Sequence, residues 1–187
     1  MGQVGRKNAG SWQLAKQAAS SCNRNFATKI KKAKKENKGI SGHFILKSLA
    51  CVDDFLGCFA QDELDKIFIT NFPCFIIVNL DSRDMNGSHW IAIGIFQDSL
   101  EIFDPLGFDI FNWPVIPCTL LSFLHRMAST RRVKVIPRIQ SDSSVLCGYY
   151  CIYYVILRKF TDFKKTFSRF HLTDFACNDD ILCNFFQ

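Results

Sequence analysis

Three short apolar runs in the middle of the chain constrain its fold more than any other feature. Residues 74–79 are continuously apolar and rich in β-branched side chains, as in a strand covered on both faces. After a polar loop, residues 90–96 form a second run, and a tight turn leads to a third at 100–103. The last two runs predict an antiparallel hairpin. Residues just before its first strand and just after its second strand therefore lie at the same end of the sheet.

The segments around this hairpin predict an α+β fold. Residues 147–159 are apolar nearly all round, which indicates a helix buried at the domain centre. The sum is a small mixed or antiparallel sheet packed against that central helix. The remaining patterns predict helices at 43–51, 119–129 and 174–186, a brief strand at 67–70 and an edge strand at 132–137.

The length and cysteine content set the class of protein. A chain of 187 residues suits one domain with its own core, and its longest apolar run is too short to cross a membrane. The N-terminus has no apolar signal region, so we expect a protein that is not secreted and whose nine cysteines stay reduced. The four histidines lack zinc-type spacing, and no metal is expected.

Charge is concentrated at the N-terminus. Residues 1–50 hold eleven Lys or Arg against one acid, while residues 51–187 hold twelve against sixteen. We therefore predict a basic, flexible arm at 1–40, with disorder or a marginal helix, and a separate domain at 41–187. Lysine clusters bind phosphates, although a solvated tail or a nuclear-import signal has the same composition. The candidate nucleic-acid-binding residues are Lys29, Lys31, Lys32, Lys34, Lys35 and Lys38.

One cysteine is placed as a nucleophile would be. Cys147 follows a polar run that begins at Gln140, and it opens the predicted central helix. A thiol reacts as the thiolate, and a helix N-terminus is one of the few places that lowers a thiol pKa. Gly148 leaves the backbone beside the sulfur uncrowded, so that a substrate carbonyl can approach it. Cys151 lies one turn further on the same face and is interpreted as a core residue.

The predicted hairpin supplies a base and a carboxylate for this thiol. His89 precedes one strand and Asp104 follows the next, so we expect them to meet. A carboxylate that accepts the Nδ1–H of a histidine fixes its tautomer and stabilises the imidazolium. The alternatives are a surface histidine and an aspartate that only caps the turn at Pro105. Trp90 belongs to the core, to the wall of the cleft, or to both.

Gln140 completes the set. Acyl transfer needs hydrogen-bond donors aimed at the developing oxyanion. The side-chain amide of Gln140 and the backbone N–H of Cys147 would together provide two such donors. An ordinary polar loop residue is the alternative. The order His, Asp, Gln, Cys predicts a cysteine hydrolase.

These residues resemble the adenovirus-type cysteine endopeptidases, which share a clan with the ubiquitin-like-protein proteases. The matching segments are Ser88-His89-Trp90, Phe103-Asp104-Pro105-Leu-Gly-Phe108, and Gln140 with Cys147-Gly148-Tyr-Tyr-Cys151. Phe55-Leu56-Gly57 is similar to a motif near the N-terminus of that family. Asp104 stands where adenoviral members often have Glu. The basic arm is longer, and the tail after Cys147 shorter, than in those members.

The resemblance runs from about Phe55 to Lys159, and it implies an adenain-like fold for the protease domain predicted at 41–187 and a role for each of the four residues. Cys147 is then the nucleophile, His89 the general base, Asp104 the residue that orients it, and Gln140 the oxyanion donor. The substrates implied are viral precursor proteins, or those of virus-like elements, cleaved at small-residue or Gly-containing sites during particle maturation. The virion and the host nucleus are the implied locations.

The chemistry needs no cofactor, but adenoviral members of the family are stimulated by DNA and by a peptide, so the resemblance implies that either could stimulate this chain. Two other functions remain open at this point. One is a protease that removes a ubiquitin-like modifier with the same residues. The other is a catalytically silent protein that binds DNA or the viral core through the basic arm.

Overall fold

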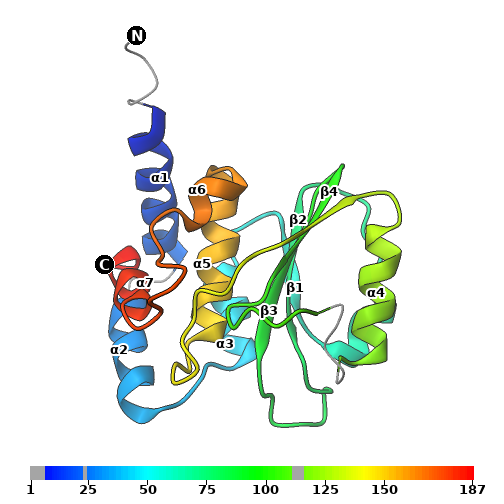
Figure 1. Ribbon diagram of the computed structural model, residues 1–187, viewed down its shortest axis with the longest axis horizontal. Coiled ribbons are helices and arrows are strands. Elements are labelled where there is room, and N and C mark those ends of the chain that lie inside the picture. The colour runs from blue at the N-terminus through cyan, green and yellow to red at the C-terminus, as the bar shows by residue number, and fades with distance from the viewer. Residues whose placement is uncertain (1–6, 23–24, 111–115) are drawn as a thin grey trace.

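A five-stranded mixed sheet organises the protein in the computed structural model, which describes residues 7–22, 25–110 and 116–187 (Figure 1). The strand order is β1-β2-β3-β4-β5, with both outer pairs parallel and the two inner pairs antiparallel. The strands are β1 (Phe55–Ala60), β2 (Cys74–Asn79), β3 (Trp90–Ile95), β4 (Ser99–Phe103) and β5 (Arg132–Val135). The predicted hairpin is β3–β4, and the predicted fold class is confirmed.

Helices cover both faces of this sheet. The 3-10 helix η1 (Gln61–Lys66) and α4 (Cys118–Ala128) pack on one face, and α5 (Cys147–Phe160) packs on the other (Figure 1). Around α5 lie α1 (Lys7–Cys22), α2 (Phe26–Glu36), α3 (Gly42–Leu49), α6 (Phe163–Phe167) and α7 (Asn178–Phe185). All six residues of β2 are buried, as its continuous apolar run predicts.

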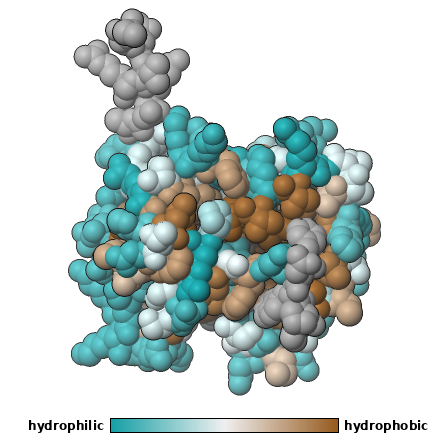
Figure 2. All heavy atoms as spheres, in the orientation of Figure 1, coloured by the Kyte–Doolittle hydropathy of each residue, from teal (hydrophilic) through white to brown (hydrophobic). Residues whose placement is uncertain are grey.

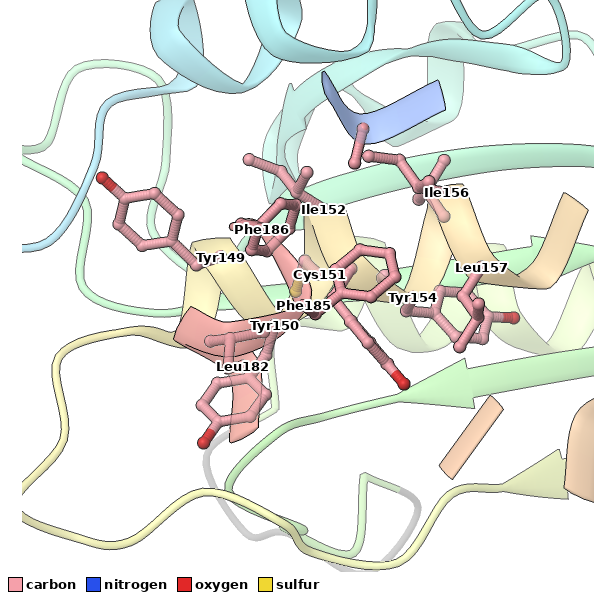
Figure 3. Close-up of a cluster of buried hydrophobic side chains, with 14 of the residues drawn as sticks. Tyr149, Tyr150, Cys151, Ile152, Tyr154, Ile156, Leu157, Leu182, Phe185 and Phe186 are labelled. Atoms are coloured by element: carbon pink, nitrogen blue, oxygen red, sulfur yellow. The ribbon is translucent and has the colours of Figure 1, made fainter. Parts of the chain in front are cut away.

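The central helix α5 is buried on every side. Every residue from Cys147 to Leu157 is buried, and Figure 3 shows its side chains pointing outward in several directions. Leu182, Phe185 and Phe186 of the α7 region pack beside it (Figure 3). Tyr150, Tyr153 and Tyr154 bury their rings while their hydroxyls donate hydrogen bonds, such as the one from Tyr153 to the carbonyl of Thr166 at 2.7 Å. The helix predicted at 147–159 is therefore confirmed as the centre of the domain.

The N-terminal segment differs from the flexible arm that its composition predicts. It forms α1 and α2, and a narrow stripe of small and apolar residues on these helices joins the main core. That stripe consists of Ala15, Ala19, Phe26, Ile30 and Ala33, all buried. Lysines dominate the composition, but apolar residues spaced three or four apart suffice to bury one side of a helix. Of the two predicted alternatives, disorder and a marginal helix, the described part of this segment adopts the helix.

Two local predictions need correction, and one strand was not predicted. Residues 67–70 form no strand, whereas β1, which was not predicted, pairs with β2. Cys22 and Cys51 form a disulfide with a Cα–Cα distance of 5.9 Å, so the expectation of reduced cysteines is wrong for this pair. The disulfide joins the end of α1 to the segment after α3, and the other seven cysteines are free. Among the described residues, no helix is long and apolar enough to span a bilayer.

Candidate active site

The β3–β4 hairpin brings His89 and Asp104 together. Ala92 pairs with Phe103 in the antiparallel register, so the residues just outside the two strands lie side by side. The Nε2 atom of His89 is 2.7 Å from Oδ1 of Asp104, and both side chains are buried. The expected meeting therefore occurs, but through Nε2 and not through Nδ1. This choice leaves Nδ1 as the ring nitrogen available to Cys147.

Asp104 has a second task in the turn that follows β4. Its Oδ1 also accepts the backbone N–H of Leu106 at 2.8 Å, and its carbonyl accepts that of Gly107 at 3.0 Å. The turn-capping alternative and the pairing with His89 are thus both realised. Gly107 has φ +71°, and a Cβ there would lie 2.9 Å from the Cα of Arg138, so this tight turn requires glycine.

The surroundings of His89 favour its charged form. Burial by itself lowers the pKa of His89, but hydrogen bonds and charge from Asp104 and Cys147 outweigh burial and raise the pKa to about 9. His89 is therefore an imidazolium at neutral pH. A cationic imidazole beside a thiol is the arrangement that keeps a cysteine in its nucleophilic form.

Cys147 begins helix α5, as predicted, and is 8% exposed. The first N–H groups of a helix have no partner within the helix, so they are available to an anion at this end. Cys151 is one turn away, and burial raises its pKa well above the usual value for a thiol. Its Sγ lies 3.4 Å from the carbonyl of Trp90. Of the two cysteines, Cys147 has the setting of a nucleophile and Cys151 that of a core residue.

Gln140 is held beside this helix end by its backbone and its side chain. Its N–H donates to the carbonyl of Pro105 at 2.9 Å, which ties it to the residue after Asp104. Its Nε2 donates to the carbonyl of Ser144 at 2.7 Å. An amide nitrogen carries two hydrogens, so one fixes the group and the second remains for another acceptor. Oε1 is buried and has no hydrogen-bond partner among the described residues.

These side chains line one cleft of about 650 Å³. His89, Trp90, Gln140 and Cys147 all contribute to its wall, together with Ile40 from the segment between α2 and α3. The indole N–H of Trp90 donates to the carbonyl of Ile40 at 3.0 Å. Trp90 thus packs against the main core and also walls the cleft. Ile40 was not predicted, because the segment before it was expected to be flexible.

Gly148 has a different setting from the one its sequence position suggests. It is buried, and a Cβ at this position would lie 2.6 Å from Cγ1 of Ile40 and 3.2 Å from Cδ1 of Trp90. The absence of a side chain therefore lets the Ile40 segment close onto the start of α5. The lining residues of the cleft include Cys147 and Trp90 but not Gly148.

The predicted nucleic-acid-binding lysines are exposed on α2 and at its C-terminal end, opposite the buried stripe. Some of them already have partners. Lys34 pairs with Asp180 at 2.9 Å, Lys32 pairs with Glu36 at 3.7 Å, and Lys29 lies 4.4 Å from the ring centre of Phe44. Hydrophilic side chains dominate the region of α2 on the face shown in Figure 2. The remaining members of the group are Lys31, Lys35 and Lys38.

The chain is similar to known proteins over its central part. A family profile described as adenovirus endoprotease matches residues 55–174. A protein named Protease from Bovine adenovirus 7 is 29% identical over 130 residues, which cover 59% of each chain. A Protease from Bovine adenovirus 2 is 27% identical over 115 residues, covering 57% of this chain and 56% of the relative. The chain thus spans a little more than half the length of these curated relatives.

The family match covers more than half of the chain and includes His89, Asp104, Gln140 and Cys147. On this similarity, the chain belongs to the adenovirus endoprotease family.

Proposed function

We propose that this protein is a viral cysteine endopeptidase with Cys147 as its nucleophile. The observation that carries this proposal is that His89, which is 2.7 Å from the buried Asp104, lines the same cleft as the cysteine at the start of α5. The name Protease of the two relatives supports the same class of activity.

In the first half of the reaction, Cys147 is acylated by the substrate. The Cys147 thiolate attacks the carbonyl carbon of the scissile peptide bond and forms a tetrahedral intermediate. The Cys147 N–H and the second Nε2 hydrogen of Gln140 would stabilise its oxyanion, and such a donor is worth about 3 kcal/mol. The His89 imidazolium then gives its proton to the leaving amine, the C–N bond breaks and a thioester remains.

The second half restores the enzyme. Neutral His89 takes a proton from a water molecule, whose oxygen attacks the thioester carbonyl. The second tetrahedral intermediate expels the thiolate, and the carboxylic acid product leaves. Asp104 keeps the ring orientation constant through both halves, because its Oδ1 is itself fixed by the N–H of Leu106.

Residue-resolved alkylation tests the assignment. Each cysteine is alkylated with iodoacetamide between pH 5 and 9 and quantified by mass spectrometry, in wild type and in His89→Ala. We expect Cys147 alone to react quickly near pH 6, and the substitution to abolish this reaction. Cys151 is the internal control, because its pKa is raised by burial. If Cys147 reacts like an ordinary thiol of pKa about 8.5, the assignment fails.

The substrate class we propose is the precursor proteins of a virus or virus-like element, cleaved at small-residue or Gly-containing sites during particle maturation in the virion and host nucleus. Hydrolysis of short Gly-containing peptides by wild type but not by Cys147→Ala would support an endopeptidase. Cleavage only of folded ubiquitin-like fusions would instead support a deconjugating protease.

We also propose that DNA binds the exposed lysines of α2 without sequence preference. The plot of log K against log salt has a negative slope, and each phosphate contact that is lost makes it shallower by about 0.9. A Lys31→Gln/Lys32→Gln/Lys35→Gln variant should therefore show a slope shallower by about 2 to 3. A Lys66→Gln/Lys164→Gln variant, which removes exposed lysines elsewhere, is the control. Equal slopes for wild type and the α2 variant would rule out this site.

A peptide is the other stimulating partner we propose. β5 is an edge strand on which Val133 and Val135 are 40% and 46% exposed, and hydrophobic side chains gather over the sheet in Figure 2. An extended peptide could add to this edge as a further strand. Peptidase activity of the purified chain with neither DNA nor added peptide would show that neither is required.

A further inference from the structure

The loop between Gln140 and Cys147 is fastened from the side by helix α7. Ser144, in the middle of this loop, forms hydrogen bonds through its carbonyl oxygen and its Oγ. Its carbonyl accepts the Nε2 hydrogen of Gln140 at 2.7 Å, and its Oγ donates to Oδ1 of Asp179 at 2.9 Å. The Ser144 Oγ also accepts the N–H of Leu146 at 3.3 Å. The position of the Gln140 amide thus depends on Ser144, and that of Ser144 depends on α7.

Asp179 joins the loop to the helix that carries the nucleophile. The same Oδ1 atom accepts the hydroxyl of Tyr150 at 2.9 Å, and Tyr150 lies one turn into α5 from Cys147. Burial, with the charge of Asp179, raises the pKa of Tyr150, so that the hydroxyl keeps its proton and remains a donor. Asp179 is itself only 9% exposed. One carboxylate oxygen therefore sets the distance between Ser144 and the first turn of α5.

The neighbouring residue Asn178 holds α7 in place for this contact. Its Nδ2 donates to the carbonyls of Ile139 at 2.7 Å and His171 at 2.8 Å, and its Oδ1 accepts the N–H of His171 at 2.9 Å. Ile139 directly precedes Gln140. The first two residues of α7 therefore hold the chain on both sides of Gln140.

We propose that Asp179 is a positioning residue for the oxyanion donor. It fixes Ser144, whose carbonyl takes one Nε2 hydrogen of Gln140 and so directs the other hydrogen into the cleft. Asp179 contacts Ser144 and Tyr150 and does not touch the reacting atoms. This inference rests on the proposed function, and it concerns a residue outside the family match at 55–174.

The expected effect follows from the precision that the donor needs. Asp142 and Ser143 of the loop are exposed, so Asp179 and Tyr150 provide the buried polar anchor on this side. Without the Asp179 carboxylate, the Ser144 carbonyl can rotate, and the side-chain amide of Gln140 that donates to it rotates with it. A misplacement of about 1 Å in a catalytic group can cost on the order of 10²-fold in rate.

Three variants test the proposal with a Gly-containing peptide in the absence of DNA. Asp179→Ala removes the acceptor, Asp179→Asn keeps a neutral acceptor at the same place, and Asp180→Ala changes the exposed neighbour on the same helix. For Asp179→Ala we expect kcat to fall by about 10- to 100-fold while KM stays within about twofold. Asp179→Asn should recover most of this loss, and Asp180→Ala should match wild type.

Alkylation of Cys147 by iodoacetamide separates positioning from general damage, because displacement of iodide forms no oxyanion. The alkylation rate of Asp179→Ala should equal that of wild type. In a Gln140→Ala background, Asp179→Ala should add less than about twofold to the loss in kcat, since the two residues act as a unit. Equal kcat for Asp179→Ala and Asp180→Ala would overturn the inference, as would loss of alkylation or full additivity with Gln140→Ala. A wild-type chain that lacks peptidase activity both with and without DNA would instead overturn the proposed function itself.

Discussion

The buried carboxylate of Glu101 leads to a sharp prediction for stability. Glu101 lies on β4, three residues before Asp104, and its side chain is 0% exposed. Its two oxygens accept hydrogen bonds from Nε and Nη2 of Arg158 on α5 at 2.8 and 3.0 Å. They also accept the hydroxyl of Tyr154 at 3.0 Å and the ammonium of Lys134 at 3.2 Å. This cluster joins the strand before Asp104 to the helix that begins at Cys147.

Glu101→Gln keeps the shape of the side chain but removes its charge. The guanidinium of Arg158, whose side chain is 12% exposed, would then lack its buried counter-charge. Removing one partner of a buried ion pair costs about 3–5 kcal/mol of unfolding free energy. Lys134 differs because its side chain is 37% exposed, and water screens its share of the cluster. We expect Lys134→Ala to cost less than about 1 kcal/mol.

Urea denaturation followed by tryptophan fluorescence measures both costs. The double variant Glu101→Leu/Arg158→Met replaces the pair with apolar groups, and it should be less destabilised than Glu101→Gln alone. This comparison separates the penalty of an unpaired charge from a simple loss of packing. A cost below about 1 kcal/mol for Glu101→Gln, or equal costs for Glu101→Gln and Lys134→Ala, would refute the reasoning.

Three further predictions concern the cleft and its pH dependence. Asp104→Asn removes the charge and weakens the hydrogen bonding that raise the pKa of His89. In a pH–rate profile, kcat falls at alkaline pH where His89 loses the proton that it gives to the leaving amine, and the midpoint of this fall should move from about 9 toward 6.5. A midpoint that stays near 9 would contradict this. Gly148→Ala should push Ile40 out of place, because the new Cβ would lie 2.6 Å from its Cγ1, and should raise KM, whereas Gly10→Ala, with no atom within 4 Å of the added carbon, should leave KM unchanged. Trp90→Phe loses the hydrogen bond to the Ile40 carbonyl and should cost about 0.5–1.5 kcal/mol of unfolding free energy, measured by urea denaturation; no change would show that this bond adds nothing to stability.

Local sequence patterns were sufficient to predict the central strands of the sheet and the pairing of His89 with Asp104. The hairpin follows from two apolar runs and a tight turn, and an antiparallel register then brings His89 to Asp104. The same patterns could not predict which ring nitrogen of His89 faces the carboxylate of Asp104. The choice of Nε2 depends on the rotation of the imidazole ring, which neighbours distant in the sequence determine.

Long-range packing explains what sequence analysis missed. The apolar stripe of α1 and α2 is too narrow to identify a buried helix until the positions of α5 and α7 are known. Ile40 and Asp179 contribute to the site through contacts with Trp90 and Ser144, which are far away in the chain. No local pattern around either residue indicates such a contact.

The fastening of the Gln140–Cys147 loop by α7 has a consequence for the time at which activity arises during synthesis. His89, Asp104 and Cys147 all leave the ribosome before Asn178 and Asp179, because chains are made from the N-terminus and domains fold as they emerge. Until α7 has docked, the loop lacks its anchors at Ile139 and Ser144. A nascent chain would therefore carry the proposed nucleophile Cys147 before the amide of Gln140, the proposed oxyanion donor, is held in place. Such an order of assembly would delay the complete site until α7 has been synthesised and has docked.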